Sequence, residues 1–174
     1  MTLADLLVAL AVTGVLLTGA LGLLEQGRRA YEVGAARVEA QQAARVALAR
    51  LARDIRHAGA GGAIAAVAVA EPQRLVLQQD LDGDGAAVAP GETVTWRLAG
   101  SVLRRDAGAG GQPVINGVRD LRLVYLDADG NPATGPADVR SVDATLTTGP
   151  DHATSAGGSG VGARMATRVA LRNR

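Results

Sequence analysis

The chain has 174 residues, enough for one ordinary domain with an extension but not for two full domains. Its formal net charge of +1 indicates neither a nucleic-acid-binding protein nor a protein with an acidic partner by overall balance. The chain contains no Cys, which excludes disulfides, zinc–thiolate sites and thiol nucleophiles, and its 2% of aromatic residues disfavours a base-stacking surface.

The first predicted element is an apolar helical segment over residues 1–24. No charged residue occurs from Leu6 to Leu24, and at about 1.5 Å per residue this run nearly spans a bilayer core of about 30 Å. A secretory signal peptide would carry basic residues before a shorter apolar core and a small-residue cleavage site after it, and neither is present. We therefore expect a membrane-spanning half-helix with one carboxylate, Asp5, at its start.

The helix is predicted to continue as an amphipathic half over residues 25–58. This stretch contains no Pro and is rich in Ala, Arg, Glu, Gln and Leu, which are strong helix formers. Apolar residues recur on one face at helical spacing: Ala44, Leu48, Leu51, Ile55 and Ala58. Arginines occupy the opposite side: Arg45, Arg50, Arg53 and Arg56. Glycines immediately after residue 58 predict the end of the helix.

A β-rich head is predicted over residues 59–174. Several segments alternate apolar and polar residues or are enriched in β-branched residues: 74–79, 92–98, 101–106, 121–127, 139–148 and 165–173. Turns rich in Gly, Asp and Pro separate them, which predicts one antiparallel sheet of about five or six strands. The clearest hairpin has a predicted tight turn at Ala99 and Gly100. Residues 149–163 are nearly all small or polar and predict a mobile loop.

The stretch DLDGDG contains a candidate calcium site. Three acids stand at the first, third and fifth positions of an EF-hand loop: Asp80, Asp82 and Asp84. The twelfth position, which the EF-hand fills with Glu, is Gly91, and Glu92 comes one residue late. Two interpretations stay open, a calcium-binding turn unlike the EF-hand or a plain turn between strands. The stretch DADGN over 127–131 is a weaker version of the same pattern.

No residue pattern indicates catalysis. His57 lies near the predicted helix end and His152 in the predicted loop, and neither has a Ser or a carboxylate at the spacing of a triad. The glycine-rich stretches 59–62 and 108–111 lack the strand-to-helix context of a dinucleotide site. We therefore predict a non-catalytic protein with no cofactor other than the candidate calcium. The helix arginines indicate a solvated face, so nucleic acid is not an expected partner.

The N-terminus resembles that of type IV pilins and type II secretion pseudopilins. Mature chains of this family begin with Phe or Met followed by TLIELLVALAI or a similar run. The matching residues here are Thr2, Leu3, Leu6, Leu7, Val8, Ala9, Leu10 and Gly14, with Asp5 in place of the usual Glu. The segment ALARLARDIRHAG over 47–59 resembles minor pilins of the PilW type, as do DLDGDG, VYLDADG and the terminal VALRNR.

The resemblance implies a fold and a function. The fold is the α+β pilin fold, in which one long N-terminal α-helix, about residues 2–58, packs by its C-terminal half on an antiparallel β-sheet. The function is that of a non-catalytic minor pilin, which initiates or caps a type IV pilus by N-terminal helix bundling. The implied partners are major and minor pilin subunits, a prepilin peptidase, the inner-membrane assembly platform and, before assembly, membrane lipid. The chain would cross the bacterial inner membrane once, with a periplasmic head, and then enter the extracellular filament.

The resemblance also implies roles for residues near the N-terminus. Met1 would be the first residue after removal of a basic leader and the site of N-methylation. Asp5 would pair with the N-terminal amine of a neighbouring subunit, although an acid there also caps a helix and the two roles can coexist. Leu3, Leu6 and Gly14 would contribute to assembly. Further glycines along the helix, at 19, 22, 27 and 34, would allow either close helix packing or unwinding during assembly.

Three alternative assignments stay open. A minor pseudopilin of the type II secretion system, GspJ-like, would have the same architecture in a shorter filament, and its genomic neighbourhood would separate it. A major pilin would be abundant in sheared filaments. From a different class comes a membrane-anchored binding module, which would be unprocessed and monomeric.

Overall fold

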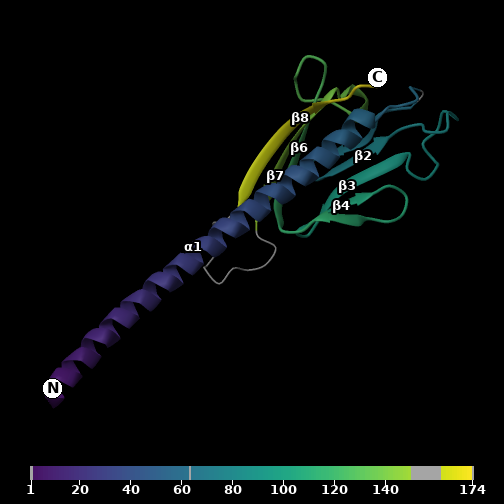
Figure 1. Ribbon diagram of the computed structural model, residues 1–174. Coiled ribbons are helices and arrows are strands. Elements are labelled where there is room, and N and C mark those ends of the chain that lie inside the picture. The colour runs from purple at the N-terminus through teal and green to yellow at the C-terminus, as the bar shows by residue number, and fades with distance from the viewer. Residues whose placement is uncertain (1, 63, 150–161, 174) are drawn as a thin grey trace.

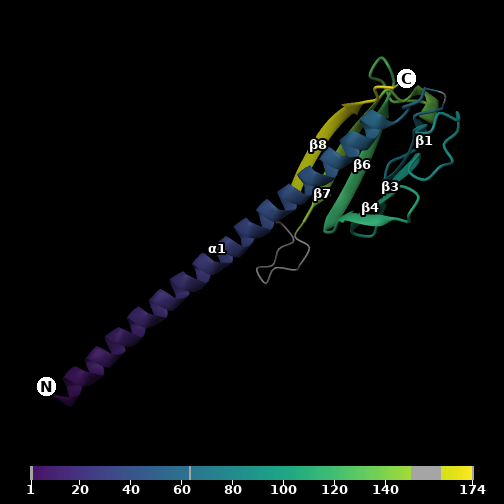
Figure 2. The ribbon, with the colours of Figure 1, turned by 45° about the vertical axis from the view of Figure 1, so that its right-hand side comes forward.

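The computed structural model describes residues 2–62, 64–149 and 162–173, and its dominant element is the helix α1, Leu3–His57. Thr2 is the N-cap and Ala58 the C-cap, so the predicted helix over 2–58 is confirmed to within its capping residues. With 55 residues, α1 extends over about 83 Å. Its N-terminal half projects from the head as a free rod, as Figures 1 and 2 show.

The strands in the described residues form two antiparallel sheets. The first sheet has the order β1-β2-β3-β4-β5, with bounds Val67–Glu71, Arg74–Gln78, Thr93–Ala99, Val102–Asp106 and Gln112–Ile115. The second has the order β6-β7-β8, with bounds Val118–Leu126, Ser141–Thr148 and Ala163–Ala170. A short 3-10 helix, η1, spans Pro136–Asp138 before β7. The predicted α+β class, one long helix packed on an antiparallel sheet, is confirmed.

The predicted single sheet of five or six strands needs correction, because the described residues contain eight strands that divide between two sheets. The unpredicted strand β1 lies in an Ala-rich run, and the unpredicted β5 contains Pro113, so neither carries a strong strand signal. The chain leaves the first sheet at Gly117, whose φ of +67° lies in the left-handed region that glycine favours. The predicted loop over 149–163 falls mostly outside the described residues.

The turn of the β3–β4 hairpin is shifted by one residue from its predicted place. Ala99 pairs with Val102, so the two loop residues are Gly100 and Ser101. Gly100 has a φ of +61°, and no non-glycine residue in the described chain has a positive φ. This is the pattern of a type II′ turn, which requires glycine at its first loop position. The prediction erred because it placed the glycine second.

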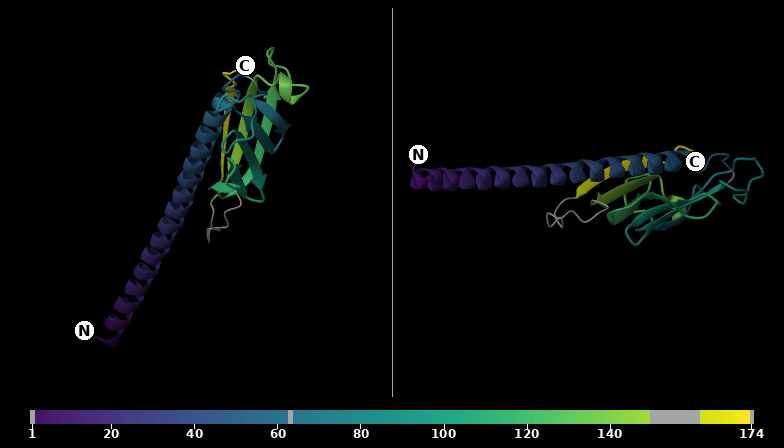
Figure 3. Two further views of the ribbon diagram at one scale, coloured as in Figure 1. Left: turned by 90° about the vertical axis from the view of Figure 1, so that its right-hand side faces the viewer. Right: turned by 60° about the horizontal axis from the view of Figure 1, so that its bottom comes forward.

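The C-terminal half of α1 packs on β7 and β8, as Figure 3 shows. Every member of the predicted apolar stripe is buried: Ala44, Leu48, Leu51, Ile55 and Ala58. Buried alanines extend and widen this stripe: Ala36, Ala40, Ala47 and Ala52. Because alanine side chains are small, the helix can lie close to the strands. The stripe joins residues of both sheets, including Trp96 and Leu146, in one hydrophobic core.

Hydrogen bonds fix both ends of the packed half-helix. The buried hydroxyl of Thr148, at the end of β7, donates to the carbonyl oxygen of Ala40 at 2.7 Å. At the other end, the Asn173 amide contacts the last helical carbonyl oxygens, including that of His57 at 3.4 Å. A Cβ on Gly59 would clash with the backbone oxygen of Asn173, and Gly59 has a φ of +74°. The helix therefore ends where the C-terminal segment crosses it.

Candidate functional site

The N-terminal half of α1 exposes a continuous apolar surface. All described residues up to Tyr31 are exposed, and several leucines and valines are exposed over more than half of their surface, for example Leu23 at 73%. By length and composition α1 is able to cross a membrane. An apolar surface of this extent is unfavourable in water, and its composition fits an apolar environment such as a membrane.

Asp5 closes a capping box at the start of this surface. Its Oδ2 accepts a hydrogen bond from the Thr2 backbone N–H at 2.8 Å, and Thr2 Oγ1 accepts one from the Asp5 N–H at 3.3 Å. The capping role is therefore confirmed. Within the described residues, the side-chain hydrogen bond of Asp5 is to Thr2 alone, in its own helix. Pairing with an amine stays a prediction, and Met1 lies outside the described residues.

The other predicted assembly residues are accessible. Leu3 is 81% exposed and Leu6 57% exposed, and a Cβ on Gly14 would meet nothing within 4 Å. The same open space surrounds the later helix glycines at 19, 22, 27 and 34, and α1 continues through all of them without a break. In the single chain these glycines serve no packing contact, so both close packing and unwinding in an assembly stay open.

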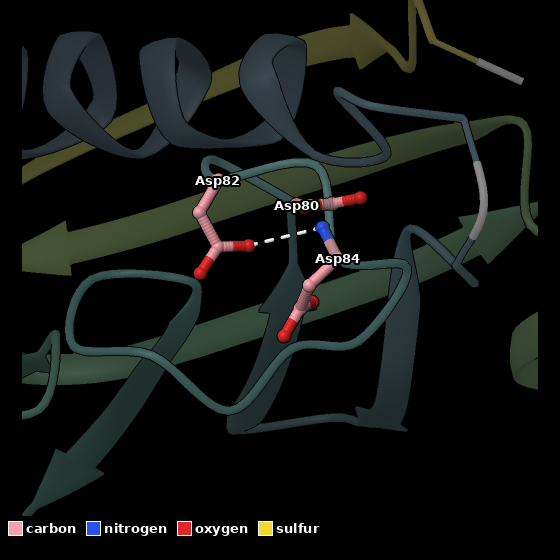
Figure 4. A group of neighbouring side chains, drawn as sticks. All are labelled: Asp80, Asp82 and Asp84. Atoms are coloured by element: carbon pink, nitrogen blue, oxygen red, sulfur yellow. Dashed lines mark hydrogen bonds between the residues drawn. The ribbon is translucent and has the colours of Figure 1, made fainter.

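The acidic turn after β2 is ordered by its own backbone. Asp80 Oδ1 accepts from the Gly83 N–H at 2.6 Å, and its Oδ2 accepts from the Gly85 N–H at 3.0 Å. Asp82 Oδ1 accepts from the Asp84 N–H at 3.1 Å, as Figure 4 shows. The plain-turn interpretation therefore has a direct structural basis, because Asp side chains hold this backbone in tight turns.

Glu92, the acid one residue late for an EF-hand, anchors this turn instead of facing a ligand. It is fully buried, and its Oε1 accepts from the Leu81 N–H at 2.9 Å while its Oε2 accepts from the Ala89 N–H at 2.7 Å. These backbone donors lower the pKa of the Glu92 carboxyl below its ordinary value, against the opposing effect of burial. The sequence singled out Glu92 only by its spacing, which did not indicate this role.

The three loop aspartates nevertheless lie together. One carboxylate oxygen from each of Asp80, Asp82 and Asp84 lies within 4.8 Å of the others, a spacing compatible with calcium–oxygen distances of about 2.3–2.6 Å. The Asp84 N–H lowers the pKa of Asp82, but desolvation and repulsion from the neighbouring acids outweigh it, so the pKa is raised. The donor set fits a hard cation, and calcium binding stays a prediction.

Three further features of the sequence remain, the two histidines and the weaker acidic turn. His57 is exposed at the end of α1, and His152 lies outside the described residues. In the weaker acidic turn, Asp127 Oδ1 accepts from the backbone N–H groups of Asp129 and Asn131, both at 2.9 Å. Asp127 and Asp129 form no cluster of three metal-ligating groups within the described residues. This turn therefore has a structural explanation of its own.

A partly buried polar contact that sequence reasoning missed joins α1 to the first sheet. Asp54 Oδ2 accepts from Trp96 Nε1 at 2.8 Å and from Arg105 Nε at 2.7 Å, and Asp54 Oδ1 accepts from Arg105 Nη2 at 3.2 Å. Trp96 and Arg105 are cross-strand partners on β3 and β4, which presents both donors to the helix. No local pattern signals this triad of side chains, because Asp54 is 42 residues from Trp96 and 51 residues from Arg105 in the chain.

A scan against protein-family models and a search of curated protein sequences find no match to this chain. Functional inference therefore starts from the residues themselves and from the division of α1 into an exposed and a packed half.

Proposed function

We propose that this protein is a non-catalytic minor pilin, a subunit that initiates or caps a type IV pilus through bundling of its N-terminal helix. The observation that carries the proposal is the exposed apolar half of α1, which continues without a break into a half that is packed on the head. A chain of this shape presents an exposed apolar helix surface to other subunits at a distance from its own core. The N-terminal resemblance to pilins supplies the kind of assembly.

Two environments account for the exposed half-helix. Before assembly, Leu6 to Leu24 would lie in the bacterial inner membrane as a single pass, with the head in the periplasm. After extraction by the inner-membrane assembly platform, the same surface would pack against helices of major and minor pilin subunits in the extracellular filament. Both environments are apolar, so the helix would exchange lipid contacts for helix contacts with little change in burial.

Asp5 would provide the register of this packing. A carboxylate in an apolar helix bundle costs about 2.5–3.5 kcal/mol or more when it is unpaired, and an N-terminal ammonium is costly too. Docking that brings the two together offsets both penalties. The capping box already holds Asp5 Oδ2 on Thr2, so Oδ1 would receive the amine of the neighbour.

The state of Met1 tests the proposal. A prepilin peptidase would remove a leader and methylate the Met1 amine, so mass spectrometry of the full-length protein purified from its native host should find N-methylated Met1. Loss of methylation in a peptidase-deficient strain is the matched control. An unmethylated initiator Met on a protein that stays monomeric in the membrane would instead identify a membrane-anchored binding module and refute the pilin assignment.

A further inference from the structure

A basic groove runs along the flank of α1 beside β8, the strand that lies next to the helix in Figures 1 and 3. Its volume is about 860 Å³, and it is open to solvent. Arg45 and Arg53 project from the exposed side of α1 into its lining, Arg56 follows near the helix end, and Arg172 lines it beyond β8. The buried side chains of Leu48 and Ala52 contribute an apolar wall.

The groove concentrates more positive charge than the overall balance of the chain indicates. Its lining contains four arginines and no Asp or Glu, although the net charge of the whole chain is only +1. In the described part of the chain, ion pairs engage other arginines, such as Arg105 and Arg168, but none of the four in the groove. Clustered guanidinium groups without carboxylate partners favour an anionic ligand.

The second wall of the groove is a free sheet edge. β8 is the last strand of its sheet and pairs with β7 alone among the described strands. Met165 and Thr167 line the groove together with Ala166, whose side chain points to the opposite face of the strand. Residues from both faces line a groove only where it follows the edge of a strand. Backbone donors and acceptors of β8 therefore border the arginines.

We propose that this groove binds an extended acidic peptide segment of a partner protein, which adds as a strand to the free edge of β8. Residues four apart on a bound strand point to the same side and lie about 13 Å apart. Arg45 and Arg53 are separated by about 12 Å along α1, so two acids at this spacing match both guanidinium groups. Backbone pairing would provide affinity, and the arginines would select for acidic side chains.

Two other anions fit the groove less well. Arg45 is 21 residues beyond Leu24, about 31 Å along the helix axis, which places the groove far from lipid headgroups at the end of the apolar run. The lining contains no aromatic side chain on which a nucleic-acid base could stack. A nucleic acid also lacks the alternating amides and carbonyls that pair with a strand edge.

Fluorescence anisotropy on the full-length protein in non-ionic detergent micelles tests the proposal. The probe is a labelled peptide of about nine residues in which Glu alternates with Thr, a sequence with strand propensity and acids at the required spacing. We expect saturable binding that weakens with added salt. The double variant Arg45→Glu with Arg53→Glu should bind at least about tenfold more weakly, because two ion pairs become repulsions. The control is Arg50→Glu, an exposed residue of the same half-helix that lies outside the groove, which should retain affinity within about twofold.

Two competing probes separate strand addition from simple charge attraction. Alternate N–H groups of a strand point to opposite edges, so two N-methylated versions of the peptide can be made, each blocked along one edge. The version blocked along the edge that faces β8 should bind at least about tenfold more weakly than the other. Equal binding of the two N-methylated versions would overturn strand addition. Tighter binding of an oligothymidine of the same charge would overturn the peptide assignment in favour of nucleic acid, and absence of any peptide binding at millimolar concentration would overturn the site. None of these results depends on filament assembly, so the pilin proposal is tested separately.

Discussion

Two aspartates on α1 show how differently one residue type can act on one helix. Asp5 bonds only to Thr2 within the described chain and lies far from the core, whereas Asp54 joins the helix to Trp96 and Arg105 inside the head. We therefore expect that the first carboxylate can be changed without disturbing the head, whereas the second cannot. Substitutions at these residues therefore separate assembly from folding.

Substituting Asp5 should impair incorporation into the filament and leave the head folded. Asp5→Asn keeps an oxygen that can accept from the Thr2 N–H but removes the charge, so it isolates amine pairing from helix capping. We expect both Asp5→Asn and Asp5→Ala to reduce the amount of protein in sheared filaments, and Asp5→Glu to retain it. Normal incorporation of Asp5→Asn would mean that Asp5 acts only as a cap.

Substituting Asp54 should destabilise the head. Asp54→Ala leaves the Trp96 indole N–H and the largely buried Arg105 guanidinium without their acceptor, which should lower the free energy of unfolding by about 2–4 kcal/mol. Denaturant unfolding monitored by the single tryptophan measures this directly. Arg53→Ala, next to it but exposed, should change the free energy by less than about 0.5 kcal/mol. An equally small effect of Asp54→Ala would show that the triad is not stabilising.

The acidic turn should make stability depend on pH through Glu92. Its pKa is lower in the folded protein than its ordinary value of 4.5, so its contribution is complete above that pH and is lost as the pH falls through the folded pKa. Glu92→Gln should therefore show a smaller loss of unfolding free energy between about pH 7 and about pH 3. Asp82 has a raised pKa, so Asp82→Asn should steepen the loss on acidification instead. Parallel pH profiles of the unfolding free energy for Glu92→Gln and the parent would contradict the lowered pKa of Glu92.

At the scale of the element, the two halves of α1 differ in how they are stabilised. The packed half is held by its buried stripe, by Thr148 on Ala40 and by Asn173 at its end, whereas the exposed half has only its own backbone and the Asp5 cap. Glycines in an exposed helix each weaken it by about 1 kcal/mol relative to Ala. The exposed half is therefore the softer part of the element.

Gly22→Ala should stiffen the exposed half without a steric penalty, because a Cβ there meets nothing within 4 Å. Hydrogen exchange of the neighbouring amides in detergent micelles should slow by about fivefold, which corresponds to about 1 kcal/mol. Incorporation of Gly22→Pro into filaments would then separate the two roles of the glycine. A protein that assembles by unwinding tolerates Pro, and one that needs a continuous, closely packed helix does not.

At the scale of the whole molecule, the head and the exposed half-helix should be separable. The first fully buried helix residue is Ala36, so a variant that begins at Arg28 removes no core side chain and keeps the Arg28–Glu32 ion pair. We expect this variant to be monomeric in water and to unfold in micelles within about 0.5 kcal/mol of the full chain. The full chain should require detergent or lipid. Aggregation of the shortened variant would show that the head depends on the removed segment.

The sequence by itself determined the helix and its division into two halves, because the spacing of apolar residues along a helix can be read from neighbouring residues. The stripe from Ala44 to Ala58, the capping role of Asp5 and six of the strands follow from such local patterns. The resemblance that suggests a pilin also lies in contiguous residues.

Only the tertiary structure decided which distant groups meet. The separation into two sheets, the Asp54 triad and the groove between α1 and β8 all depend on residues far apart in the chain. The weak strands β1 and β5 form because neighbouring strands supply hydrogen bonds and burial that their own side chains do not predict. Periodicity fixes which face of an element is apolar, but it does not state what that face will contact, because the partner is selected by packing of the whole chain.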